Sequence, residues 1–290
     1  MTHDVDARTT PELTNPRAER VRSVRALSGR SVRERQGRFL VEGPQAVREL
    51  VRCEPARVRE LYLSPDAARR HPELATDAAA AGLRVRSGTA QVLDAMSPDA
   101  QGVVAVADLL APGPADVLAA GPRLVAVLAH VRDPGNAGTV VRSADAAGAD
   151  AVVLTEASVD VHNPKVVRAS AGSLFHLPVV RGGAPAEVVA SLREAGLTVL
   201  AADGAGQWDL DDLLDAVGPG GGRHAGVPDL ARPTAWLFGN EARGLEPEER
   251  ALADAVVRVP VHGRAESLNL ATAAALCLYA SARAQRRGGR

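Results

Sequence analysis

Short apolar runs alternate with alanine-rich amphipathic stretches along most of the chain. In the first half this pattern predicts strands at 39–41, 58–63, 83–85 and 102–107, and helices at 17–27, 44–51 and 65–81. In the second half it predicts strands at 124–128, 151–154, 198–201, 235–238 and 256–259, and helices at 138–147, 164–171, 188–195 and 268–286. Brief apolar runs separated by helices are typical of a parallel sheet buried on both faces. The pattern therefore predicts an α/β protein.

Proline and glycine divide the chain into two predicted domains. Two clusters of these residues mark a linker at 110–122, between a smaller α/β domain at 17–109 and a larger one at 123–290. Residues 1–16 are polar and lack periodicity, which predicts disorder. The glycine-rich stretch 218–226 is interpreted as a surface insertion.

The composition excludes several classes of protein. Aromatic residues make up only 2% of the chain, which argues against RNA binding by rows of stacking rings. Cys53 and Cys277 lie far apart, so neither a disulfide framework nor a zinc pattern is present. We therefore expect inert thiols, no metal and a reducing, cytoplasmic location. No signal peptide and no run of about 18 apolar residues is found, so no membrane span is expected.

The net charge of -1 does not indicate a nucleic-acid partner, but the distribution of charge is uneven. Residues 17–38 contain eight arginines, opposed only by Glu19 and Glu34. Such a segment can neutralise phosphates. It can equally be the solvated helix face of an arginine-rich protein, and the charge alone leaves both interpretations open.

The familiar phosphate-loop, dinucleotide-binding, nucleophile-elbow and zinc-protease motifs are absent. One unusual loop, 133–139, follows a predicted strand and leads into a helix that carries Arg142. Asn136 lies at the mouth of this helix. A helix N-terminus beside a guanidinium suits a phosphate or a ribose. The alternative is an ordinary helix cap with a surface arginine.

Two further loops also follow apolar strands. In the first, a strand runs directly into Gly239-Asn240-Glu241, where Gly239 would allow a ligand close to the backbone and Glu241 is either a functional carboxylate or a helix-start residue. In the second, Ser267 resembles a helix N-cap. Asn269 stands where alanine or leucine would favour the helix more, which indicates a functional role.

The three loops, taken together and in this order, resemble the three motifs of the SpoU (TrmH) family of RNA 2′-O-methyltransferases in the SPOUT superfamily. The resemblance covers about residues 122–285 and rests on Asn136, Gly138, Arg142, Gly239, Glu241, Gly244, Leu245, Pro260, Ser267, Leu268 and Asn269. Residues 38–108 resemble, more weakly, the small ribosomal-protein-like RNA-binding domain that often precedes the catalytic domain.

The resemblance implies a catalytic α/β domain with a deep trefoil knot, S-adenosylmethionine as cofactor and a ribose 2′-hydroxyl as methyl acceptor. It marks cofactor contacts at Gly239, Val259 and Leu268, and a catalytic set of Arg142, Asn136, Glu241, Ser267 and Asn269. Arg142 would either assist deprotonation or stabilise the developing alkoxide, with Glu241 orienting it. A guanidinium keeps its proton in proteins and is a poor base, so both roles stay open at this point.

The resemblance also implies a homodimer, in which the apolar stripe of the last helix is one candidate contact and burial within one subunit is the other explanation of that stripe. Ribosomal RNA, 23S in particular, is the favoured substrate, with no DNA or membrane partner. The alternatives are a transfer RNA methyltransferase, a non-catalytic RNA-binding relative, and a nucleotide-dependent oxidoreductase, which the missing glycine fingerprint disfavours.

Overall fold

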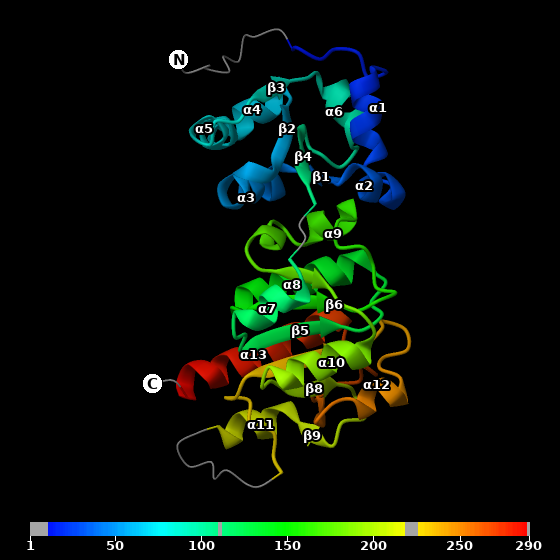
Figure 1. The fold of residues 1–290 in the computed structure, drawn as a ribbon, viewed down its shortest axis with the longest axis vertical. Helices are drawn as coiled ribbons and strands as arrows, with labels where there is room; N and C mark the ends of the chain where they lie inside the picture. Colours follow the sequence, from blue (N-terminus) through cyan, green and yellow to red (C-terminus); the bar gives the residue numbers. More distant parts are fainter. Residues whose placement is uncertain (1–10, 110–111, 218–225, 289–290) are drawn as a thin grey trace. The chain divides into compact units, whose positions relative to one another are not determined.

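The computed structural model describes residues 11–109, 112–217 and 226–288, and the chain separates into two compact units (Figure 1). Unit 1 contains the described residues up to 109 together with Asp160–His176, and unit 2 contains the remainder. The predicted disordered residues 1–10 and most of the predicted insertion at 218–226 lie outside the described residues. No helix within the described ranges is both long and apolar enough to cross a membrane.

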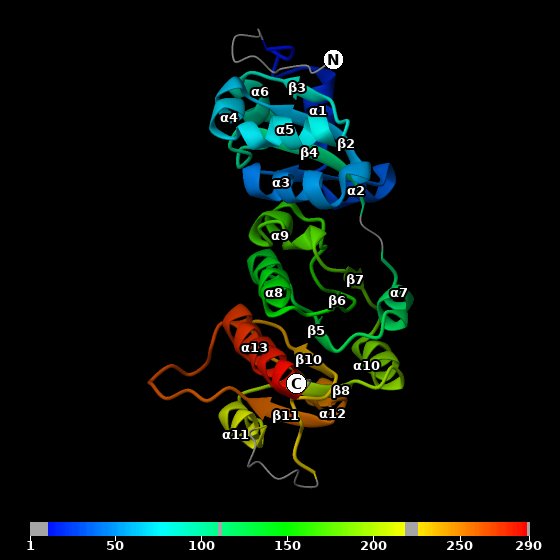
Figure 2. The ribbon, with the colours of Figure 1, turned by 90° about the vertical axis from the view of Figure 1, so that its left-hand side faces the viewer.

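Unit 1 is built on a four-stranded sheet with the order β1-β4-β2-β3, in which only β2 and β3 run parallel. Its strands are β1 (Arg38–Glu42), β2 (Val58–Leu63), β3 (Val85–Ser87) and β4 (Val103–Asp108). Its helices before residue 110 are α1 (Glu19–Ala26), α2 (Arg30–Gln36), α3 (Pro44–Cys53), the 3-10 turn η1 (Pro55–Arg57), α4 (Pro65–Arg70), α5 (Pro72–Ala80) and α6 (Ala90–Met96). Helices α1 and α6 bury Val24 and Leu93 against Val104 and Val106 of β4, while α3 packs on β1 and β4 with α5 beside it (Figure 2).

The segment 160–176 packs into unit 1 although it follows the predicted linker. It contains α9 (Pro164–Ala169) and the 3-10 turn η2 (Ser173–Phe175), which contact β1 and α3. The buried guanidinium of Arg33 donates to Asp160 and to the carbonyls of Leu27 and Ser28. Residues 160–176 therefore belong to unit 1, although the predicted second domain, 123–290, included them.

Unit 2 contains a seven-stranded parallel sheet with the order β7-β6-β5-β10-β8-β11-β9. The strands are β5 (Leu124–Leu128), β6 (Ala151–Leu154), β7 (Val179–Arg181), β8 (Thr198–Ala202), β9 (Trp208–Asp209), β10 (Thr234–Phe238) and β11 (Ala255–Arg258). The helices are α7 (Pro114–Ala119), α8 (Pro134–Ala147), α10 (Pro185–Glu194), α11 (Leu210–Ala216), α12 (Pro247–Ala251) and α13 (Leu270–Gly288). Strand β10 is buried throughout, as a central parallel strand requires.

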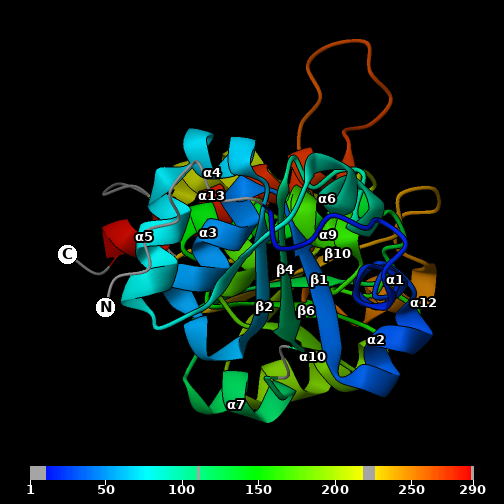
Figure 3. The same ribbon diagram turned by 90° about the horizontal axis from the view of Figure 1, so that it is seen from above.

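Helices cover both faces of this sheet. Val117 of α7 and the apolar face of α10 pack with Val127 and Leu237 on one face. On the other face, α13 packs against α8, β10 and β5, and the buried indole Nε1 of Trp236 donates to Ser281 of α13 at 2.9 Å. Between β11 and α13 the chain leaves the sheet in a long projecting loop (Figure 3).

Several predicted boundaries are wrong for local reasons. The helix predicted at 65–81 is two helices, because Pro72 restarts the helix after His71. Part of the predicted linker forms α7, with Pro114 at its first turn. Residues 11–16 are not disordered throughout, because Leu13 exchanges backbone hydrogen bonds with Ser87 and Thr89. The predicted strand at 83–85 lies two residues later, at Val85–Ser87, and α2, α6, α11, α12, β7 and β9 were not predicted.

Candidate active site

The first turn of α8 is fixed by a cap that forms where the chain leaves β5. Asp133 is the N-cap, and its Oδ1 accepts the backbone N–H of Asn136 at 2.7 Å, while Pro134 occupies the first turn. Asn136 therefore lies at the helix mouth, as predicted. Arg142 follows about 9 Å further along the helix axis. Its side chain is exposed and makes no hydrogen bond or ion pair with the residues that the structure describes.

The loop after β10 is a tight turn closed on itself. Asn240 and Gly244 exchange backbone hydrogen bonds of 2.9 and 2.8 Å, and Gly244 has a φ of +68°. A Cβ at Gly239 would lie 2.3 Å from the carbonyl carbon of Gly244. Glycine is therefore required here by the loop's own backbone, whatever ligand approaches it.

The carboxylate of Glu241 joins this turn to the start of α8. Its oxygens accept the backbone N–H groups of Asp133 at 3.1 Å and Arg132 at 3.3 Å. The same residue was expected to orient Arg142. In the described structure, Glu241 instead holds the backbone of Arg132 and Asp133, just before α8. It therefore fixes the start of the helix that carries Asn136 and Arg142.

Helix α13 begins at Leu270, and its N-terminus differs from the prediction. Asn269, not Ser267, is the cap: its Oδ1 accepts the backbone N–H of Ala271 at 2.9 Å. The side-chain amide of Asn269 then donates to Oδ1 of Asn136 at 3.0 Å. Asparagine at this position therefore favours the helix as a cap, while its second polar group binds the opposite loop.

The structure thus unites only part of the predicted set. Hydrogen bonds connect Asn136 with Asn269 and, through the Asp133 capping turn, with Glu241. Ser267 is exposed in the projecting loop, and Val259 and Leu268 are half-buried at its two ends. The cofactor contacts expected at Gly239, Val259 and Leu268 remain predictions.

Two residues that the sequence did not single out help to build this arrangement. His130 has a φ of +55°, and its carbonyl accepts the side-chain amide of Asn240 at 2.9 Å. Asp133 holds the first turn of α8. The Asp-Pro pair at a helix start is a recognisable capping pattern that could have identified Asp133. Nothing local marks His130, because its left-handed conformation depends on the loops around it.

Comparison with known protein families assigns both halves of the chain. Residues 123–279 match the model described as the SpoU rRNA Methylase family. Residues 40–112 match the model described as RNA 2′-O ribose methyltransferase substrate binding.

Two relatives are named for action on 23S rRNA. The guanosine(2553)-2′-O-methyltransferase RlmP of Bacillus subtilis is 32% identical over 92% of this chain and 98% of its own length. The uridine(2479)-2′-O-methyltransferase of Streptomyces viridochromogenes is 41% identical over 54% of this chain, a match that spans about half, 51%, of that relative.

A solved structure extends the similarity to the whole fold. The SpoU methyltransferase AviRb from Streptomyces viridochromogenes, solved in complex with the cofactor AdoMet, is 32% identical with a TM-score of 0.75. The match covers 94% of this chain and 100% of that one.

Proposed function

We propose, because this chain belongs to the SpoU rRNA methylase family, that it transfers a methyl group from S-adenosylmethionine to a ribose 2′-hydroxyl of 23S ribosomal RNA. The observation that carries the proposal is the meeting of the loops after β5 and β10 with the start of α13. There, Asn136, Asn269 and Glu241 belong to one hydrogen-bonded arrangement. In open α/β sheets, ligands bind at the carboxyl ends of the strands, where such loops lie.

Arg142 is proposed as the charged group that acts on the RNA. It extends into solvent from the helix that carries Asn136, with no carboxylate of the described residues bound to it. A guanidinium is a poor general base but a strong multiple hydrogen-bond donor. We therefore assign to Arg142 the binding of a backbone phosphate and stabilisation of the developing alkoxide. Asn136 and Asn269, held to each other, would position the ribose.

The projecting loop offers groups that fit S-adenosylmethionine. Within the described structure, the backbone N–H and C=O groups of residues 261–267 make no hydrogen bond, and the half-buried Val259 and Leu268 flank them. Free backbone groups beside apolar side chains suit an adenosine, which needs both. When bound, the cofactor supplies a methyl group already activated on a sulfonium. Alignment of the acceptor oxygen then falls to the chain's own residues. We also propose that the chain forms a trefoil knot in unit 2, as the family resemblance implies.

The arginine-rich segment 17–38 supports RNA as the partner, except for Arg33. Arg33 is buried and structural. The other seven arginines are exposed, some of them, such as Arg20 and Arg30, in surface ion pairs with Glu60 and Glu34. Exposed guanidinium groups on α1 and α2 would contact RNA phosphates. We also propose a cytoplasmic location, because that is where ribosomal RNA would be modified.

A homodimer is proposed through the outer face of α13. The apolar stripe expected to pair is largely core, because Ala274, Cys277 and Leu278 are fully buried in their own unit. In contrast, Leu276 and Tyr279 are 45% and 50% exposed and line a groove of about 510 Å³ beside α11. Large exposed apolar side chains that lie together indicate a protein contact. Sedimentation of Leu276→Lys as a monomer, beside a dimeric wild type, would test this.

The activity itself is tested with the full-length chain, labelled S-adenosylmethionine, and separate 23S ribosomal and transfer RNA fractions. We expect alkali-stable label at one ribose of 23S RNA. Arg142→Ala should keep cofactor affinity by calorimetry while turnover falls by about 10²–10³-fold, as for loss of one charge-stabilising donor. Arg142→Lys is the matched control for charge. Label in transfer RNA alone would indicate a transfer RNA methyltransferase. Failure to bind the cofactor would indicate a non-catalytic RNA-binding relative.

A further inference from the structure

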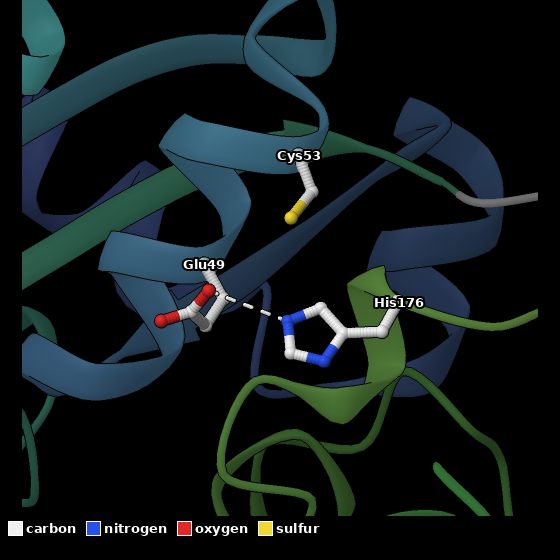
Figure 4. Close-up of side chains that lie close together, drawn as sticks. All are labelled: Glu49, Cys53 and His176. Atoms are coloured by element: carbon white, nitrogen blue, oxygen red, sulfur yellow. Dashed lines mark hydrogen bonds and ion pairs between the residues drawn. The ribbon is translucent and has the colours of Figure 1, made fainter. Parts of the chain in front are cut away.

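Three side chains of different chemistry meet in unit 1, whereas the site described above belongs to unit 2. Figure 4 shows Glu49 and Cys53 extending from α3 toward the ring of His176, which follows η2. Nε2 of His176 lies 3.3 Å from Oε2 of Glu49. One ligand atom from each of the three residues can be chosen so that all lie within 4.8 Å of one another. We propose that Glu49, Cys53 and His176 bind a Zn²⁺ ion.

The donor set selects the type of metal. A thiolate, an imidazole and a carboxylate are zinc ligands, whereas calcium and magnesium require oxygen donors. With tetrahedral bonds of roughly 2.0–2.3 Å, the ligand atoms of a zinc site lie roughly 3.3–3.7 Å apart. The His176–Glu49 separation of 3.3 Å already has this value, and Sγ of Cys53 lies within 4.8 Å of both other ligand atoms. The exposed side of the cluster leaves water as the fourth ligand.

The backbone elements that carry the ligands are fixed by packing. Glu49 and Cys53 are four residues apart, so they lie on the same face of α3, one turn apart. That helix is anchored by Val47 and Leu50, which are fully buried. On the other side, Phe175 of η2 is buried beside Phe39, with ring centroids 6.5 Å apart. Ligands on anchored elements lose little freedom when a metal binds.

The close approach of the two elements depends on a glycine. A Cβ at Gly172, where φ is +99°, would lie 2.5 Å from Cγ of Glu49. Glycine at this position therefore allows the turn before His176 to rest directly on the side chain of Glu49.

The neighbouring arginines also leave the carboxylate of Glu49 available as a metal ligand. The two arginines next to it on the outer side of α3, Arg48 and Arg52, bind Glu73 and Asp77 of α5 at 3.0 and 2.7 Å. Neither is paired with Glu49, whose carboxylate faces His176 instead. A bound Zn²⁺ would neutralise the carboxylate and thiolate and clamp the segment 160–176 onto α3. This role is independent of methyl transfer.

The test uses the reduced, metal-stripped, full-length protein. Co²⁺, a spectroscopic substitute for Zn²⁺, should bind at one ion per chain with a thiolate-to-cobalt charge-transfer band, and Zn²⁺ should displace it. Cys53→Ser should remove the band and weaken Zn²⁺ binding by at least about 100-fold, because even outer-sphere partners of metal ligands contribute roughly 10–100-fold. Glu49→Gln should weaken binding while keeping the band.

Two controls isolate the cluster. Glu54→Gln removes the carboxylate next to Cys53 that pairs with Arg57, and it should bind Zn²⁺ like the wild type. Circular dichroism confirms that each variant is folded. Co²⁺ binding without the charge-transfer band, or equal Zn²⁺ affinity in wild type and Cys53→Ser, overturns the proposal. So does an absence of stoichiometric binding by the folded wild type.

Discussion

Substitution of Asn269 separates two interactions that one side chain makes. Its Oδ1 caps α13 by accepting the N–H of Ala271, and its Nδ2 donates to Asn136. Alanine removes both, at a cost of about 1 kcal/mol for the cap and about 1 kcal/mol for the hydrogen bond. Aspartate keeps the cap, adds a charge that the helix N-terminus favours by about 0.3–1 kcal/mol, and loses only the donor.

We therefore expect Asn269→Ala to destabilise unit 2 by roughly 2 kcal/mol and Asn269→Asp to change its stability by roughly 0.5 kcal/mol or less. The methyl-transfer rate should fall in both, by about two- to tenfold for Asn269→Asp, since the orientation of Asn136 is then lost.

Tryptophan fluorescence during urea unfolding measures this in unit 2 alone, because the chain's two tryptophans, Trp208 and Trp236, both lie there. A double-mutant cycle with Asn136→Ala isolates the pair, whose coupling should be about 0.5–1.5 kcal/mol. Strictly additive losses, or equal stabilities of Asn269→Ala and Asn269→Asp, would refute this reasoning.

Three further substitutions test other parts of the structure. Gly239→Ala should destabilise unit 2 by about 1–3 kcal/mol in the same unfolding assay, because the added methyl overlaps the backbone of Gly244; an unchanged midpoint would contradict the turn geometry. Glu241→Gln should lower turnover more than cofactor affinity, since an amide presents one acceptor where the carboxylate receives two N–H groups; equal losses in both would count against it. Burial raises the pKa of Asp160, but hydrogen bonds from His162 and Arg33 outweigh it and hold that pKa below its ordinary value. Asp160→Asn should therefore lose stability at neutral pH, and the difference from wild type should shrink as the pH falls below about 4, measured by circular dichroism.

Apolar periodicity predicted the longer strands well because their ends are chemically abrupt, while it missed or shifted the strands of two or three residues, β3, β7 and β9. The bounds of β2, β5 and β6 agree with the sequence to the residue. Proline was harder to interpret. Pro72 interrupts a stretch that we predicted as one helix, whereas Pro114 begins a helix inside a stretch that we predicted as a linker. Both outcomes follow from the missing N–H and fixed φ, and the sequence alone does not decide between them.

The placement of segment 160–176 could not be derived from local pattern. Its helix α9 was predicted, but the partners that hold it are distant: Arg33 binds Asp160 across 127 positions, and Glu42 binds Arg168 across 126. The same separation hid the cluster at His176. A zinc pattern is recognised in sequence by closely spaced ligand pairs, and only Glu49 and Cys53 are close.

For the candidate site, the motifs identified the loops but not the contacts within them. Asn136 and Asn269 were both predicted, yet their hydrogen bond spans 133 positions and depends on how α13 packs against α8. Ser267 was taken for the cap because serine is a common N-cap residue, and Asn269 is an equally good one. The choice between them is made by the point where the projecting loop enters α13.

Some arginines of this chain are bound by carboxylates and Arg142 is not, and this difference supports the role proposed for Arg142. Arg33, which is buried, is held by Asp160, and the half-buried Arg168 is held by the buried carboxylate of Glu42. Arg142 extends from a helix whose first turn is fixed by three side chains, yet no described carboxylate binds it. An arginine that must receive a phosphate would lose affinity if its own chain neutralised it first. Rigid neighbours combined with an available charge are what recognition of an RNA backbone requires.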